Sequence, residues 1–113
     1  MPPRSQLTEA PPYAVEETIK KLGASLRTAR LRRNITLADM AAKLGVSRYV
    51  VADAEKGKVT TNVAVYVGML WAMNLLNHME LVADPAHDEE GLALSVFDER
   101  ERARQKGGLS NDF

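Results

Sequence analysis

The sequence contains no cysteine, no long hydrophobic run, and little proline outside its first residues. Without cysteine there is no disulfide, no thiolate zinc site and no cysteine nucleophile. No apolar stretch approaches the roughly 18 residues that a membrane-spanning helix needs. The first residues also lack the apolar region of a secretory signal. Together these absences predict a cytoplasmic protein.

What is present is an ordinary globular composition with an uneven charge distribution. The 113 residues are 45% hydrophobic and 27% charged, which predicts one compact domain. The net charge is zero, yet residues 20–58 carry ten basic and three acidic residues, whereas residues 59–113 carry four basic and nine acidic. Unless this is random surface scatter, the basic block favours a polyanion and the acidic block a different partner.

Apolar spacing and breaker residues divide the chain into three segments. Residues 1–12 hold four of the five prolines and are expected to form a flexible N-terminal arm. Residues 13–83 carry helical apolar spacing, and residues 84–113 form an acidic, loosely ordered C-terminal segment. Gly23 leaves room for a break in the first long helix. Residues 75–82 fit either a helix or a strand, and a helix is preferred. Helices are predicted from about Val15 to near Asn34 and over residues 37–44, 47–56, 62–73 and, weakly, 89–101.

The strongest pattern lies in residues 36–58, where two short helices are joined by a glycine turn. Thr36 and Ser47 are suited to cap the two helices, and Gly45 to supply the sharp turn between them. Ala41 is small where the helices must cross closely. The second helix opens with polar side chains, as in a helix-turn-helix whose second helix enters the DNA major groove.

These residues resemble the Cro/lambda-repressor-type (XRE) helix-turn-helix domains over about residues 22–76. The resemblance implies an all-α, compact lambda-repressor-like bundle of about five helices, with flexible terminal segments, that binds DNA in a sequence-specific way. It also implies that Arg30 and Glu55 form a structural pair tying the first helix to the third. The matching residues are Thr36, Met40, Ala41, Leu44, Gly45, Val46, Ser47, Val51, Glu55, Gly57 and Lys58.

The same resemblance assigns the residues that face bases. Arg48 is suited to a bidentate contact with guanine, and Tyr49 or Ala52 to contact with a thymine methyl. Tyr49 alternatively packs on the adjacent turn. Asp53 departs from the family, which often has a neutral or basic residue there; it reads cytosine, filters sequences, or points away. The base-contacting set is Arg48, Tyr49, Ala52 and Asp53.

Phosphate contacts are implied on both sides of the groove. Leu37 stands where the family usually has a glutamine that helps to hold a phosphate, so one side-chain contact is missing. Backbone N–H groups at that helix start are still able to bind a phosphate. The phosphate-contacting set is Thr36, Lys43, Lys56 and Lys58.

The helix over residues 62–73 is more apolar than one core face requires. Tyr66, Val67, Leu70 and Met73 suffice by spacing to cover a core face. The remaining apolar residues indicate a second face and a homodimer, which suits recognition of a palindromic operator. The alternative is a wide core stripe covered by residues 75–97. The predicted dimer interface is Val63, Met69 and Trp71.

The region from Leu81 to Leu94, with the basic stretch and the Leu109–Phe113 ending, looks like HipB antitoxins of HipA-type kinase toxins. That similarity implies a dimer that represses its own operon and neutralises the toxin by binding it. The C-terminal segment is then expected to fold against the partner, and a merely disordered tail is the alternative. Its predicted partner-binding residues are Leu92, Val96, Phe97 and Phe113.

Nothing in the sequence indicates catalysis. His78 and His87 lack metal-ligand spacing, and there is no glycine-rich phosphate loop, so neither an enzyme nor a cofactor is expected. Two other functions remain open beside the antitoxin. One is a phage- or plasmid-type XRE repressor without a toxin partner. The other is an interaction adaptor that does not bind DNA, for which Leu37 and Asp53 are the best arguments.

Overall fold

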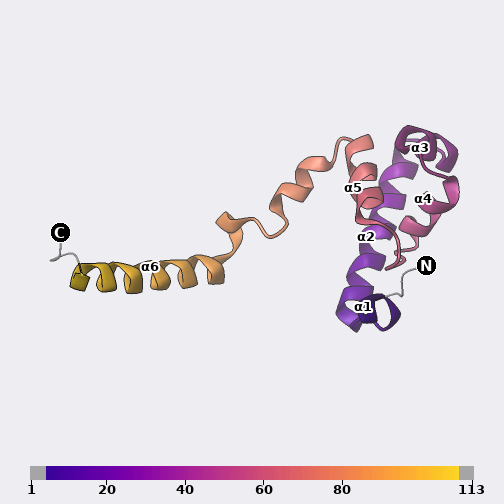
Figure 1. Cartoon of the computed structure of the whole chain (residues 1–113). Coiled ribbons are helices and arrows are strands. Elements are labelled where there is room, and N and C mark those ends of the chain that lie inside the picture. Colours follow the sequence, from indigo (N-terminus) through magenta and orange to yellow (C-terminus); the bar gives the residue numbers. More distant parts are fainter. Residues whose placement is uncertain (1–4, 110–113) are drawn as a thin grey trace. The chain divides into compact units, whose positions relative to one another are not determined.

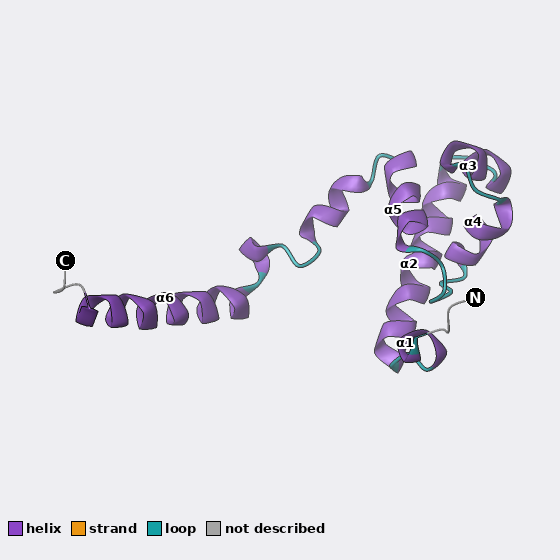
Figure 2. Cartoon of the chain, viewed as in Figure 1, coloured by secondary structure: helices purple, strands orange, loops and turns teal. Residues whose placement is uncertain are grey.

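The structure is a computed structural model that describes residues 5–109, with side chains as far as residue 105. Every regular element in this range is a helix and none is a strand (Figure 2), which confirms the predicted all-α class. The chain divides into two units, Met1–Leu76 and Asn77–Phe113. Figure 1 labels the α-helices, and the elements are α1 (Gln6–Glu9), α2 (Tyr13–Arg32), α3 (Leu37–Leu44), α4 (Arg48–Glu55), α5 (Val63–Ala72), the 3-10 helices η1 (Leu76–Leu81) and η2 (Pro85–His87), and α6 (Glu89–Leu109).

The first unit is a helical bundle in which α2 to α5 enclose one apolar core. The largest fully buried side chains come one from each helix: Leu26, Met40, Val51 and Met69. Close packing of this kind stabilises a small domain because each buried side chain removes apolar surface from water. The fold is the compact lambda-repressor-like bundle that the sequence predicts.

Helix α2 runs without interruption through Gly23, so the break that this glycine allows does not occur. Gly23 is buried, and a β-carbon there would collide with the backbone carbonyl oxygens of Ala54 and Glu55. Gly57 has a φ of 71°, and a β-carbon added there would collide with the backbone of Lys20. The two glycines therefore let α2 and the end of α4 approach backbone to backbone.

The helix-turn-helix has the caps and turn that the sequence predicts. Thr36 Oγ1 accepts a hydrogen bond of 3.0 Å from the Asp39 N–H at the start of α3. Ser47 Oγ accepts one of 3.3 Å from the Val50 N–H at the start of α4. Gly45 ends α3 in the left-handed region with a φ of 69°, which a side chain would disfavour.

Helix α5 corrects one predicted interface residue. Met69 is fully buried, together with Val65, Tyr66, Leu70 and Met73, so it belongs to the core and not to an outward face. The prediction for Met69 was wrong because α5 is apolar nearly all round, and its spacing does not identify which stripe faces inward. Val63 and Trp71 do lie on the surface, 68% and 54% exposed.

The segments outside the bundle differ from the expectations in three ways. A helical turn, α1, lies in the segment expected to be a flexible arm, and Ser5 caps it. The unit boundary and the end of α6 also differ, whereas residues 76–81 adopt a 3-10 helix, η1, in line with the preference for a helix over a strand. The division between units falls after Leu76 instead of residue 83, and α6 continues to Leu109 instead of ending near residue 101.

Candidate nucleic-acid interface

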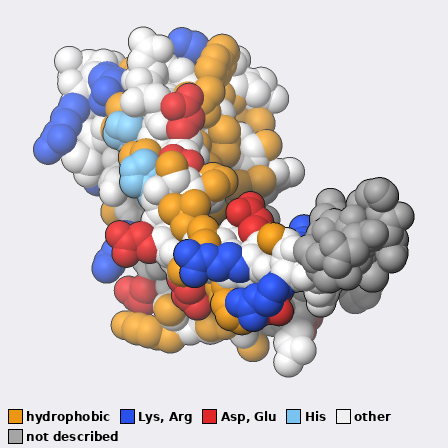
Figure 3. Space-filling view, turned by 90° about the vertical axis from the view of Figure 1, so that its left-hand side faces the viewer, with side chains coloured by type: hydrophobic (Ala, Val, Ile, Leu, Met, Phe, Trp, Pro, Cys, Tyr) orange, Lys and Arg blue, Asp and Glu red, His pale blue; other side chains and the backbone are white. Residues whose placement is uncertain are grey.

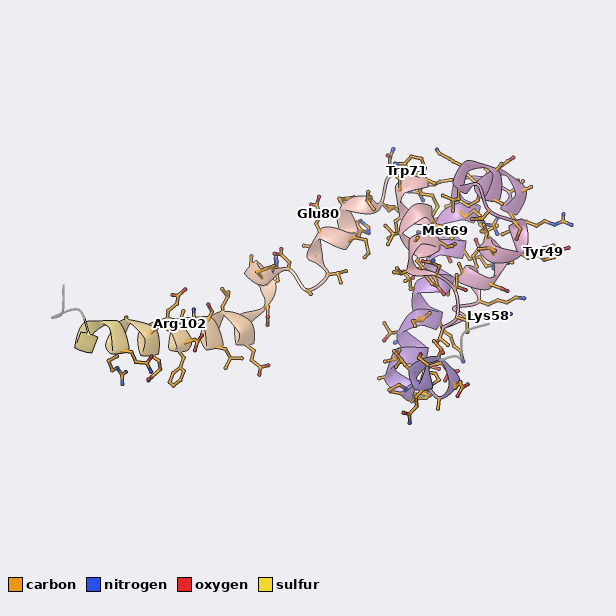
Figure 4. All side chains as sticks on the ribbon, viewed as in Figure 1. Tyr49, Lys58, Met69, Trp71, Glu80 and Arg102 are labelled. Atoms are coloured by element: carbon orange, nitrogen blue, oxygen red, sulfur yellow. The ribbon has the colours of Figure 1, made fainter. Side chains whose placement is uncertain are left out.

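The first turn of α4 presents two exposed side chains, those of Arg48 and Tyr49. Tyr49 is 70% exposed and projects outward from α4, as Figure 4 shows, so it does not pack on the adjacent turn. The Arg48 guanidinium lies 5.5 Å from the centre of the Tyr49 ring. A cation over an aromatic ring is held by the ring quadrupole, which restricts the arginine without burying it. Both side chains are therefore free to meet a ligand.

Ala52 and Asp53 lie one turn further along α4 and are only partly exposed. The Asp53 carboxylate does not stand alone, because Lys58 Nζ lies 3.2 Å from its Oδ1. Nothing in the sequence pattern indicates this ion pair, since Lys58 follows the glycine turn after α4. Of the four predicted base-contacting residues, Arg48 and Tyr49 are thus the open ones, and Asp53 already has a cationic partner.

The loop after α4 is fixed by hydrogen bonds at Lys58. The Lys58 N–H donates to the Asp53 carbonyl at 3.2 Å, and the Tyr66 hydroxyl donates to the Lys58 carbonyl at 2.9 Å. Burial raises the pKa of the Tyr66 phenol. A hydrogen bond with the Thr61 side chain lowers this pKa and the negative charge of Asp53 raises it, and the net change is upward. Tyr66 therefore keeps its proton and remains a donor to this loop.

The predicted phosphate-contacting residues fall into separate places. Lys56 and Lys58 line one hollow of about 450 Å³, and Lys20 of α2 lines it too. Lys20, which pairs with Glu16 at 3.2 Å, was not predicted as part of this site. It begins the basic block in the sequence, but only the close approach at Gly57 brings it here.

Thr36 and Lys43 belong to α3 and have other contacts. Thr36 Oγ1 accepts the capping bond described above, while Lys43 Nζ lies 5.6 Å from the centre of the Trp71 ring of α5. Lys43 and Trp71 line a second hollow of about 340 Å³ with Leu44 and Gly68. The structure therefore does not gather the four predicted phosphate ligands into one cluster.

Arg30 and Glu55 form a buried ion pair between α2 and the end of α4. Arg30 Nε donates to Glu55 Oε2 at 2.6 Å and its Nη2 donates to Oε1 at 3.1 Å. The third guanidinium nitrogen, Nη1, donates to the Ile35 carbonyl at 2.7 Å, just before α3. The Arg30 side chain thereby connects α2 to the start of α3 and to the end of α4. Removing either Arg30 or Glu55 would leave the other as an unpaired buried charge.

The second unit exposes its apolar side chains along α6. Leu92, Val96 and Phe97 are all exposed, and Figure 3 shows hydrophobic side chains among charged ones on the face drawn there. An α-helix turns by about 100° per residue, so Leu92 and Val96 share a face while Phe97 lies about 100° away from Val96. The three side chains therefore do not share one face of α6. Phe113 lies outside the described residues.

Two other features that bear on function are groups that hold a metal ion and helices that span a membrane. In the described part of the chain, no three His, Asp or Glu side chains are grouped to hold a metal ion. His87 Nδ1 instead lies 3.0 Å from Asp84 Oδ2 within η2. No helix among residues 5–109 is long and apolar enough to cross a membrane.

Comparison with known proteins adds a family to this geometry. The model of the helix-turn-helix family matches residues 26–67, which span the second half of α2, all of α3 and α4, and the start of α5. No curated protein and no solved structure was found to match the chain. The match begins at the first core residue of the bundle and includes both members of the Arg30–Glu55 pair. Residues 26–67 are therefore a helix-turn-helix domain of the XRE type, the type that sequence-specific DNA-binding regulators carry.

Proposed function

We propose that the protein is a sequence-specific transcriptional repressor that docks α4 in the major groove of its operator. The observation that carries this proposal is the exposed first turn of α4, where Arg48 and Tyr49 project from a capped helix. Arg48 is the residue suited to guanine, and Tyr49 to a thymine methyl. The helix-turn-helix match of residues 26–67 supports the same function.

Phosphates would be held on both sides of α4 in this arrangement. Lys56 and Lys58 flank Gly57 directly after α4, and Thr36 caps the start of α3. Lys43 lies in the last turn of α3, beside Trp71. Contacts of this kind position a protein on the duplex without reading sequence. They would use three of the ten basic side chains in residues 20–58.

The experiment that tests this function is a gel-shift titration on the DNA upstream of the protein's own gene. A shift at nanomolar protein that survives excess random competitor supports sequence-specific binding, since specific sites bind about 10³–10⁷ times more tightly. Footprinting then locates the operator. Equal affinity for the upstream and random duplexes would contradict the repressor function.

We also propose that the repressor is a homodimer on a palindromic operator. Val63 and Trp71 are large apolar side chains exposed on α5, and the hollow beside Trp71 is lined by further apolar residues of α3 and α5. An exposed patch of this kind is typical of an interaction surface. Two recognition helices would then read half-sites about 10 base pairs apart. Sedimentation at tens of micromolar measures the dimer, and a monomer there would contradict it.

As the finer function we propose a HipB-like antitoxin that acts in the cytoplasm, represses its operon and neutralises a HipA-type kinase toxin. The sequence similarity over Leu81–Leu94 supports this, as does α6, whose exposed Leu92, Val96 and Phe97 offer surface to a partner. Co-purification of a kinase encoded beside the gene tests it. A phage- or plasmid-type repressor would carry no such partner.

One observation favours a different function, an adaptor that does not bind DNA. Asp53 places a carboxylate on α4 and pairs with Lys58, which removes one cation from the phosphate set. Leu37 also lacks the amide of the residue usual at that position. The gel shift separates the two functions, because an adaptor would shift neither the upstream nor the random duplex.

A further inference from the structure

Asp53 and Lys58 form an ion pair at the end of the recognition helix. Lys58 Nζ lies 3.2 Å from Asp53 Oδ1, and the two side chains are 52% and 40% exposed, respectively. A pair this open is screened by water and weak. A phosphate group is therefore able to compete with the carboxylate for the lysine.

The backbone keeps Lys58 beside Asp53. Its N–H donates to the Asp53 carbonyl, and its carbonyl accepts from the buried Tyr66 hydroxyl. Gly57, with its positive φ, makes the turn that brings the lysine back over the last turn of α4. The loop backbone thus holds the Lys58 side chain within reach of Asp53.

The neighbouring lysine provides the contrast. Lys56 lies on the other side of Gly57, is exposed, and takes part in no ion pair among the described residues. Both lysines line the same hollow. The two cations therefore differ in one respect that bears on DNA: Lys58 has a carboxylate as counterion and Lys56 does not.

We propose that Asp53 is a positioning residue that acts through Lys58 and restrains sequence-independent DNA binding. Binding to random DNA depends on the number of phosphates that protein cations neutralise. A lysine already paired with a carboxylate releases fewer counterions when it reaches a phosphate, so the pair lowers that count by up to about one cation. This inference rests on the proposed DNA-binding function. It gives a role to Asp53, which stands in α4 where similar domains often have a neutral or basic residue.

The test measures the affinity of the full chain for a 20-base-pair random duplex over a range of salt concentrations. The variant is Asp53→Asn, which keeps the size of the side chain and removes its charge. It should bind about five-fold more tightly at 0.1 M salt, and the slope of log affinity against log salt should steepen by about one. Circular dichroism melting checks that the variant is folded, and Asp53→Ser provides a second substitution with the same expected gain.

Two controls separate this mechanism from a simple charge effect. Asp98→Asn removes the same charge and frees Arg102 from an ion pair of the same length, 3.2 Å, in α6 of the other unit; it should leave the slope unchanged. The second control repeats Asp53→Asn in a Lys58→Gln background. There the slope should not change, because no lysine remains to be freed.

Each outcome decides the inference. An unchanged slope in Asp53→Asn, or an equal increase in the Lys58→Gln background, overturns it while leaving the DNA-binding function intact. Absence of any DNA binding by the unmodified protein would overturn the proposed function, and this inference with it. A steeper slope only when Lys58 is present supports it.

Discussion

The two units of this chain use similar helices in opposite ways. In Met1–Leu76, the helices α2 to α5 bury a continuous set of apolar side chains and enclose an ion pair. In the second unit, no described side chain between residues 77 and 105 is buried, although α6 is the longest helix. The difference teaches that helix length does not indicate stability here. What stabilises a helix in water is chiefly the apolar face that it packs.

The largest effect is expected from breaking the buried ion pair. Glu55→Ala leaves the Arg30 guanidinium buried without its partner, so the bundle should lose about 3–5 kcal/mol of unfolding free energy. Urea denaturation followed by tryptophan fluorescence measures the first unit through Trp71. The matched control is Asp98→Ala, which breaks an exposed pair of α6 and should change this value by less than about 0.5 kcal/mol. Equal losses would contradict the distinction between the two units.

A second prediction compares two neighbours on α5. Met69→Ala creates a cavity in the core and should cost about 2–5 kcal/mol of unfolding free energy. Trp71→Ala removes an exposed ring and should cost under about 1 kcal/mol in a monomer, while weakening the dimer. Denaturation followed by circular dichroism at low concentration gives the first quantity, and sedimentation gives the second. A larger stability loss at Trp71 would reverse the assignment of core and surface.

A third prediction concerns DNA recognition by the first unit alone. Arg48→Ala should cost about 1–3 kcal/mol on the operator and relax preference at one base pair, because it removes a base contact. Lys56→Ala should weaken operator and random DNA alike and lower the salt slope by about one. Competition titrations on both duplexes distinguish them. If Arg48→Ala weakened the two duplexes equally, Arg48 would be a phosphate ligand instead.

The smallest effect on the first unit is expected from removing the second. A chain ending at Pro85 keeps every α4 contact, so it should bind the operator within about two-fold of the full chain. A two-fold change in affinity corresponds to only about 0.4 kcal/mol of binding free energy. Capture of a co-expressed kinase partner should instead fall sharply. Undiminished capture would assign the partner surface to the bundle and would falsify a role for α6.

Much of the fold could be predicted because its signals are local. Thr36, Gly45 and Ser47 act on the helix ends next to them, so the caps and the turn needed no knowledge of the rest of the chain. Met69 was misassigned for the opposite reason, since a helix that is apolar all round does not specify which side faces the core. Gly23 was uncertain because its role depends on carbonyls 31 and 32 residues away in α4.

The candidate site divides along the same line. The exposure of Arg48 and Tyr49 follows from their place at the start of a capped helix, which a sequence pattern indicates. The Asp53–Lys58 pair and the presence of Lys20 beside Lys56 depend on the turn at Gly57 and on two backbones in contact. Such proximity between side chains on different elements has no signal in spacing or composition.

By itself the sequence determined the four helices of the bundle, the caps of the helix-turn-helix, the order of its elements and the separation of basic from acidic residues. These follow from backbone propensity, hydrogen bonding at helix ends and the 3.6-residue period, all of which act within a few residues. Only the tertiary structure decided which stripe of α5 is core and which carboxylate neutralises Lys58. These depend on which surfaces meet, because burial and ion pairing are properties of two elements and not of one.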